Sequence, residues 1–132
     1  MIQSKEIGGY AEARFTVEAL SRGYAVCKPF IDSRKYDFII EKHGRFVRVQ
    51  VKATSKISSE AKDGSFYIRI GYGSDKNQSY TKKDIDIVAC YIAPLKIFYL
   101  IPIEFLGQAK RITLHPLDES SKFNPFRENW TF

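Results

Sequence analysis

The sequence predicts an α/β domain, because one helix-compatible stretch near the N-terminus is followed by a series of short strand-like segments. The stretch 4–22 is helix-compatible, and Gly23 follows it directly, as is typical just past a helix C-terminus. The clearest strand pattern spans 46–52, where three valines alternate with longer or polar residues. With 132 residues, 44% of them hydrophobic, the chain fits one packed domain over residues 1–132.

The other elements follow in order, separated by turn residues. On the helix, Arg14, Glu18 and Arg22 share one stripe, whereas Ala13, Val17 and Leu20 lie on the far side with Glu12 beside them. A hairpin turn is expected at 42–45, and a short helix at 102–109. The expected strands span 24–30, 36–41, 46–52, 65–72, 85–92, 97–101 and 111–114.

Charge and cysteine content narrow the class of protein. The formal net charge is +6, from 21 Lys and Arg against 15 Asp and Glu, which favours a polyanionic partner, with nucleic acid as the leading candidate. Cys27 and Cys90 stand far apart, with no zinc-type or redox spacing, which favours the reducing cytoplasm. Charged residues and prolines interrupt the longest apolar run, 85–105, so we expect no membrane span, and no secretory signal is recognisable.

Four polar positions mark a candidate active site. Asp37 lies on one expected strand, and Gln50-Val51-Lys52 lies on the next, after the hairpin. In such an antiparallel pair residue 37 lies opposite the segment near 50 and 52, so Asp37, Gln50 and Lys52 can share a face. With the Val51 carbonyl and Glu12 from the helix, they offer hard oxygen ligands suited to Mg²⁺, with Mn²⁺ as a substitute. Lys52 would then lie beside a reacting phosphate.

This arrangement resembles the PD-(D/E)xK nuclease superfamily, in which a helix, a strand, a hairpin and a second strand carry the active site. Within it the chain is most similar to the small homing endonucleases encoded in cyanobacterial group I introns, where Gln stands in place of the second acid. The likeness covers residues 5–52 and continues at 98–102. The chain departs from the general pattern twice, because Tyr36 precedes Asp37 where Pro is usual and Gln50 replaces an acid.

The resemblance implies a restriction-endonuclease-like core, in which a mixed central β-sheet is flanked by helices. It also implies metal-dependent hydrolysis of phosphodiester bonds in double-stranded DNA, with Glu12, Asp37, Gln50 and Lys52 as the catalytic residues. Asp37, Gln50 and the Val51 carbonyl would hold the metal, and Glu12 would assist at a second metal. The products would carry 5′-phosphate and 3′-hydroxyl ends.

Other interpretations of the same residues stay open. A structure-specific nuclease of the Holliday junction resolvase type shares this core, and a catalytically inert DNA-binding module could keep the fold. Asp37 could instead cap a turn or pair with a neighbouring cation, and Glu12 could be an ordinary helix charge. The pair Asp84 and Asp86 is explained more simply as the polar face of a strand than as a metal site.

A basic region follows the candidate site. Residues 52–83 hold seven Lys or Arg against three acids, and Tyr67 and Arg69 share one strand face that could enter a DNA groove. The candidate DNA-contacting residues are Arg48, Lys56, Lys62, Tyr67, Arg69, Lys76, Lys82 and Lys83.

One subunit carries one candidate site, whereas a double-strand break needs two, so we expect at least a homodimer. The resemblance implies a tetramer built from two dimers. Large aromatic residues near the C-terminus are candidates for the subunit contact, and packing against their own domain is the alternative. These residues are Phe123, Phe126, Trp130 and Phe132.

Overall fold

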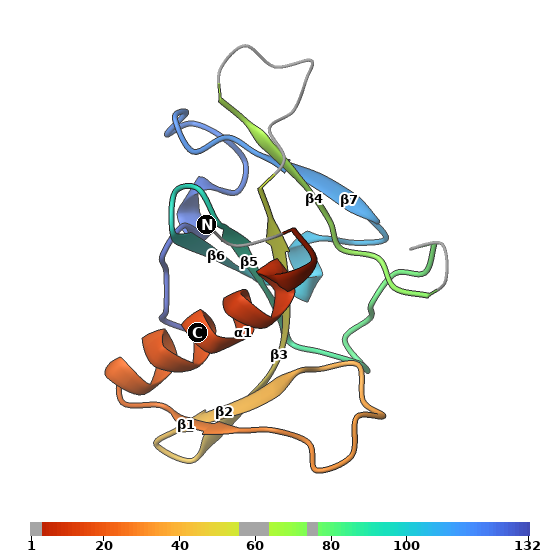
Figure 1. The fold of residues 1–132 in the computed structure, drawn as a ribbon, viewed down its shortest axis with the longest axis vertical. Coiled ribbons are helices and arrows are strands. Elements are labelled where there is room, and N and C mark those ends of the chain that lie inside the picture. The colour runs from red at the N-terminus through yellow and green to blue at the C-terminus, as the bar shows by residue number, and fades with distance from the viewer. Residues whose placement is uncertain (1–3, 56–63, 74–76) are drawn as a thin grey trace.

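The computed structural model describes residues 4–55, 64–73 and 77–132, and it confirms the α/β class (Figure 1). A turn of 3-10 helix at Ser4–Glu6 leads into the helix α1, Ile7–Ser21, which Gly23 follows at a positive φ of 87°. The strands are β1 (Ala25–Cys27), β2 (Phe38–Lys42), β3 (Arg45–Thr54), β4 (Phe66–Arg69), β5 (Ile87–Ile92), β6 (Ile97–Pro102) and β7 (Arg111–Leu114).

The central sheet is mixed, as the resemblance implied. Its five strands are ordered β1-β2-β3-β5-β6, and all neighbours are antiparallel except β3 and β5. Strands β4 and β7 form a separate two-stranded sheet. The prediction of a short helix at 102–109 is wrong, because only the 3-10 turn Ile103–Phe105 forms there. The positive φ of Gly107, 56°, turns the chain away from a helical path.

The hairpin turn fixes the register of β2 against β3. Lys42 pairs with Arg45, so the loop consists of His43 and Gly44 alone, with φ of 55° and 80°. Two positive φ values in a two-residue loop match the twist of the flanking strands. The Gly44 amide also donates to the Glu41 carboxylate at 2.9 Å. Pairing continues from this turn to Phe38 opposite Val49, which carries the register to the candidate site.

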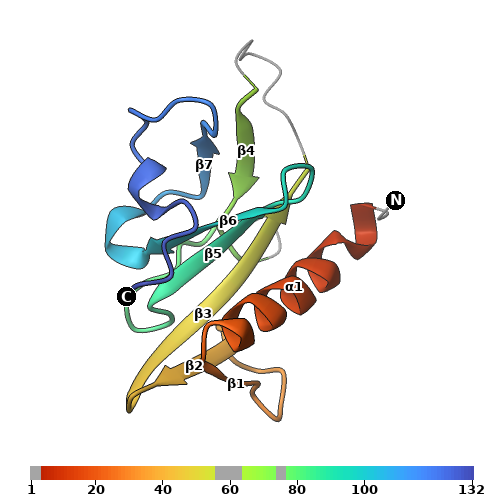
Figure 2. The ribbon, with the colours of Figure 1, turned by 90° about the vertical axis from the view of Figure 1, so that its left-hand side faces the viewer.

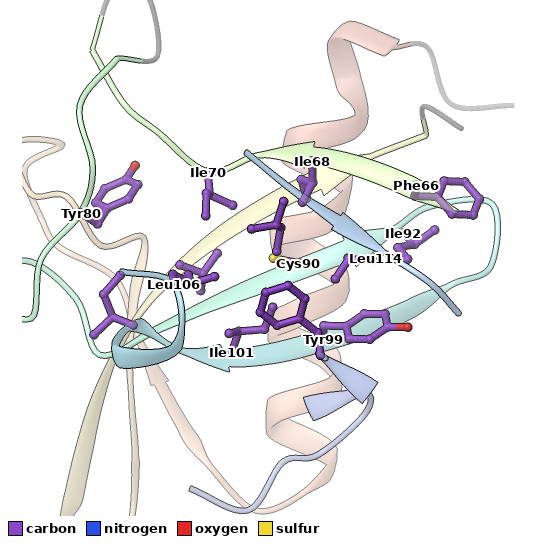
Figure 3. Close-up of a cluster of buried hydrophobic side chains, with 14 of the residues drawn as sticks. Phe66, Ile68, Ile70, Tyr80, Cys90, Ile92, Tyr99, Ile101, Leu106 and Leu114 are labelled. Carbon is purple, nitrogen blue, oxygen red and sulfur yellow. The ribbon is translucent and has the colours of Figure 1, made fainter. Parts of the chain in front are cut away.

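Two hydrophobic cores lie on the two faces of the sheet. Figure 2 shows α1 on one side of the sheet and the β4–β7 pair on the other. Helix α1 buries Ala11, Phe15 and Ala19, at i, i+4 and i+8, against the sheet, whereas Val17 and Leu20 are exposed. The opposite core is closed by side chains of β4, β5, β6 and β7 that point toward one another (Figure 3). Within the described chain, no helix is long and apolar enough to cross a bilayer.

The aromatic residues near the C-terminus pack against their own domain. The backbone at Glu128 pairs with the β6 edge, where its amide donates to the Phe98 carbonyl at 2.8 Å. Beyond it, the Trp130 ring packs in the helix-side core, with its centroid 5.5 Å from that of Phe15. The other aromatic residues of this segment also contact the domain: Phe123 is buried, Phe126 packs on Phe105, and Phe132 packs on Tyr24. The structure thus shows the packing of these side chains within their own domain, and their expected role in a subunit contact stays a prediction.

We expect Trp130→Ala to lower the free energy of unfolding by about 3–5 kcal/mol, because it leaves a cavity beside Phe15. Urea unfolding followed by circular dichroism measures the loss. Phe30→Ala is the matched control, since Phe30 is fully exposed and its removal should change stability by less than about 0.5 kcal/mol. Similar midpoints for both variants would contradict the packing of the C-terminal segment.

Candidate active site

Asp37 lies immediately before β2 and is tied to β3 by two hydrogen bonds. Its amide donates to the Val49 carbonyl at 2.8 Å, and its Oδ2 accepts from the Val51 amide at 2.8 Å. The register places residue 37 across from Gln50, as the sequence predicted. The bond from the Val51 amide was not foreseen, and it orients the carboxylate along β3. These two bonds hold both the backbone and the carboxylate of Asp37 against β3.

Gln50 is buried, with 9% of its surface exposed, on the face of β3 opposite the valines. Its Nε2 donates to the Lys35 backbone carbonyl, and because a carbonyl only accepts, this contact fixes which end of the amide carries the nitrogen. Within the described part of the chain, its Oε1 accepts no hydrogen bond. An oriented oxygen acceptor thus lies across the strand pair from Asp37.

Lys52 follows two positions after Gln50 on the same face. Its Nζ lies 3.5 Å from the Gly71 carbonyl oxygen and 5.4 Å from the centroid of the Tyr80 ring. Burial, together with the nearby charge of Asp37, raises the pKa of Tyr80 to about 12, so its hydroxyl stays protonated at neutral pH. Tyr80 is a site neighbour that the sequence did not indicate, since it reaches Lys52 from the loop after β4.

The electrostatics around Asp37 favour a bound cation. The pKa of Asp37 is raised from 3.8 to about 6, chiefly by burial and in part by the charge of Glu12, while the Val51 amide, Lys52 and Lys28 act to lower it. A carboxylate whose ionised form is disfavoured by burial and by a second carboxylate gains from a positive charge placed beside it. The site therefore combines negative charge with oxygen ligands.

Glu12 and Asp37 line one cavity of about 390 Å³ between α1 and the segment that leads into β2. The other lining residues are Lys28, Pro29, Phe30, Asp32 and Tyr36. The Lys28 ammonium lies 3.5 Å from Glu12 Oε1. The structure therefore brings Glu12 to the same site as Asp37, and it adds Lys28, which belongs to no motif in the sequence. Among the described residues, no cluster of three His, Cys, Asp or Glu side chains has the geometry of a metal site.

Arg48 has a different environment from the exposed DNA contact that the sequence predicted. Its guanidinium binds Asp86 at 3.1 Å and donates to the backbone carbonyls of Lys82 and Lys83 at 2.6 and 2.7 Å. Arg48 therefore holds the turn that precedes β5, because its donors are used within the chain. The same contacts explain Asp86 as the polar side of a strand entry, as expected.

The remaining candidate DNA contacts differ in exposure. Tyr67 and Arg69 share the outer face of β4, since Phe66 and Ile68 alternate with them into the core. Arg69 is exposed, whereas Tyr67 is half-buried with the Arg111 guanidinium 5.3 Å above its ring. Lys82 and Lys83 are exposed, and Lys82 pairs with Glu104 at 3.1 Å. Three further candidates, Lys56, Lys62 and Lys76, lie outside the described residues.

The mixed sheet thus presents Asp37, Gln50 and Lys52 from one hairpin, with Glu12 on the adjacent helix. A family model described as PD-(D/E)XK endonuclease matches residues 2–130, and the chain belongs to this family. The resemblance noted from the sequence is therefore confirmed.

Among solved structures, the chain is similar to the bacterial homing endonuclease I-Ssp6803I, with a TM-score of 0.78 and 27% identity over 98% of this chain and 90% of that one. It also shares its fold with a Holliday junction resolvase, Hjc, of the archaeal hyperthermophile Archaeoglobus fulgidus. That match has a TM-score of 0.51 and 14% identity, over 83% of this chain and 84% of the resolvase. A sequence search among curated proteins found no match.

Proposed function

We propose that this protein, as a single domain over residues 1–132, is a metal-dependent endonuclease that cuts double-stranded DNA in the cytoplasm as a site-specific homing endonuclease. The observation that carries the proposal is the pairing of Asp37 with Gln50 across the hairpin, with Lys52 beside them, in a PD-(D/E)XK fold. The similarity to a bacterial homing endonuclease over nearly the whole chain supports the particular role.

The residues at the site fit a divalent cation. Asp37 supplies a carboxylate whose ionised form is disfavoured by burial and by Glu12, and Gln50 supplies an oriented oxygen. With the Val51 carbonyl they would hold Mg²⁺, or Mn²⁺ in its place. Glu12 faces the same cavity and would assist at a second cation. Bound there, the metal supplies Lewis-acid activation of water and neutralises phosphate charge.

Lys52 provides a positive charge of the chain itself on the β3 side of the site. Its ammonium, on the same strand face as Gln50, would orient the attacking water and stabilise the negative charge that develops on the phosphate in the transition state. The Tyr80 ring and the Gly71 carbonyl limit where this ammonium can lie. The chemistry needs no covalent intermediate on the protein, because water attacks the phosphorus and the 3′-oxygen leaves.

The test is digestion of a randomised DNA library with Mg²⁺, followed by sequencing of the cut ends. A four-way DNA junction is digested in parallel as the second substrate. A homing endonuclease should cut the library at one recurrent long site, whereas a resolvase-type enzyme should leave the linear duplex intact and cut the junction. An absence of cutting on both substrates would overturn the proposed function.

We also propose that the active form is a homo-oligomer, because one subunit holds one candidate site and a double-strand break needs two sites facing opposite strands. A dimer meets this need, and a tetramer of two dimers would extend the contact with DNA. Light scattering at micromolar protein, compared with the ratio of nicked to linear plasmid, tests this. A monomer that linearises plasmid in one encounter would contradict it.

We expect Gln50→Glu to lower the Mg²⁺ and Mn²⁺ concentrations needed for half-maximal cleavage, by about tenfold, without raising the maximal rate. The added carboxylate attracts the metal, but it loses the amide contact to the Lys35 carbonyl that orients the side chain. Metal titrations of the cleavage rate measure both quantities. Gln108→Glu adds the same charge at an exposed position and should leave the titration unchanged. An unaltered response in Gln50→Glu would remove Gln50 from the metal ligands.

A further inference from the structure

Lys28 lies on the side of Asp37 that faces α1. It follows β1 directly, its side chain is 65% exposed, and it lines the cavity that Glu12 and Asp37 share. The other charged residues of this lining, within the described chain, are the acids Glu12, Asp32 and Asp37. The Lys28 ammonium is thus the positive charge of an otherwise acidic cavity.

The contacts of Lys28 hold it near the site but weakly. Its Nζ lies 3.5 Å from Glu12 Oε1 and 5.5 Å from the centroid of the Phe38 ring. Exposed ion pairs of this kind contribute about 0–1 kcal/mol, so a competing anion can displace Glu12 at little cost. The ammonium lies over the Phe38 ring and its side chain stays largely exposed, so an incoming anion can reach it.

Asp37 therefore has a lysine on either side. Lys52 approaches from β3 and Lys28 from the end of β1, and both charges act on the Asp37 carboxyl and lower its pKa against the effect of burial. A DNA strand carries one phosphate per nucleotide, so a strand whose scissile phosphate lies at Lys52 places a neighbouring phosphate within reach of a second cation at the same site.

We propose that Lys28 binds a DNA phosphate next to the scissile bond, and that in the DNA-free protein its ammonium rests on Glu12 in place of that phosphate. This inference rests on the proposed nuclease function. When Lys28 moves to the phosphate, the Glu12 carboxylate is released toward the cavity and becomes available to a cation. Lys28 thus couples the binding of DNA to the binding of metal, and each favours the other.

The experiment measures the two halves of this exchange separately, with no cleavage assay. Binding of a fluorescein-labelled duplex of mixed sequence is followed by anisotropy in EDTA over a range of salt concentrations. Binding of Mn²⁺ to the DNA-free protein is followed by electron paramagnetic resonance. Lys28→Ala should weaken DNA binding several-fold and reduce the salt slope by about 0.9, the value for one phosphate contact. It should also tighten Mn²⁺ binding several-fold, because the ammonium no longer competes for Glu12.

Two control variants keep the result interpretable. Lys28→Arg retains the charge and should keep the wild-type salt slope. Lys122→Ala removes the same charge from a lysine that also lies over a phenylalanine, 5.2 Å from the Phe123 ring centroid, and it should change neither measurement. If Lys28→Ala behaves like Lys122→Ala, or if only one of the two effects occurs, the exchange is overturned. If the wild-type protein binds neither DNA nor Mn²⁺, the proposed function itself fails.

Discussion

Lys52→Ala is expected to reduce the rate of DNA cleavage by about 10³-fold or more, because Lys52 is the cation that this chain places beside Asp37 and Gln50 on β3. DNA affinity should fall little, since it comes from phosphate contacts spread over the surface. Single-turnover cleavage of plasmid DNA and anisotropy in EDTA measure the two quantities.

Two further variants separate chemistry from folding. Lys52→Met keeps an unbranched side chain at this position and removes the charge that lies over the Tyr80 ring, so it should lose cleavage while its urea midpoint stays near that of the wild type. Lys110→Ala removes an exposed charge elsewhere and should cut normally. A Lys52→Met protein that is folded and fully active would refute the role of the ammonium.

Asp37→Asn is expected to abolish cleavage and, in metal-free buffer near neutral pH, to stabilise the fold. The amide can still accept the hydrogen bond from the Val51 amide, but it can no longer bind a divalent cation as a carboxylate does. Since the carboxyl is buried beside Glu12, an uncharged side chain at this position also removes an unfavourable charge.

The pH dependence follows from the pKa of Asp37, which rises from 3.8 to about 6 on folding. The folded protein binds this proton more tightly than the unfolded chain, so wild-type stability falls as the pH rises from about 4 to about 6 and the cost is complete above that range. Without any screening by solvent, this change in pKa would correspond to a loss of about 3 kcal/mol in the free energy of unfolding. Because the carboxyl is only partly buried, contact with water reduces the expected loss to about 1 kcal/mol.

Urea unfolding in EDTA at two pH values measures this difference. Asp37→Asn should exceed the wild type by about 1 kcal/mol near pH 7.5 and approach it near pH 4. Glu119→Gln, at an exposed position, should match the wild type at both values. A wild-type protein that is more stable than Asp37→Asn at neutral pH without metal would show that the carboxylate is not disfavoured by its surroundings.

The parts of the site that the sequence predicted are those fixed by local rules. The two-residue turn His43-Gly44 and the valine alternation of β3 together determine which residues of β2 and β3 face each other. The juxtaposition of Asp37 with Gln50 follows from that register. These features depend on residues close in sequence, so the pattern alone was sufficient.

The parts that the sequence missed depend on how distant elements pack. Lys28 reaches the site because α1 brings Glu12 over the end of β1, and Tyr80 reaches Lys52 through the loop after β4. The alternating pattern of β3 predicts that the Arg48 side chain points away from the valine core. Its guanidinium nevertheless binds Asp86, which is 38 residues away in the sequence. Contacts of this range leave no periodic signal in the chain.

The closure of the helix-side core by Trp130 has a consequence for the order in which the protein acquires its structure. Phe15 lies in the first helix and packs on Phe38 and Phe98, and a further aromatic partner, Trp130, comes more than a hundred residues later. Pairs so distant in sequence must pay the entropy of a long loop before they contribute, and topologies that depend on them fold slowly. During synthesis the helix and the β2–β3 hairpin can emerge early, but the core that supports Asp37 is complete only after residue 130 has left the ribosome. Catalytic competence should therefore arise late in folding, once Trp130 has joined this core.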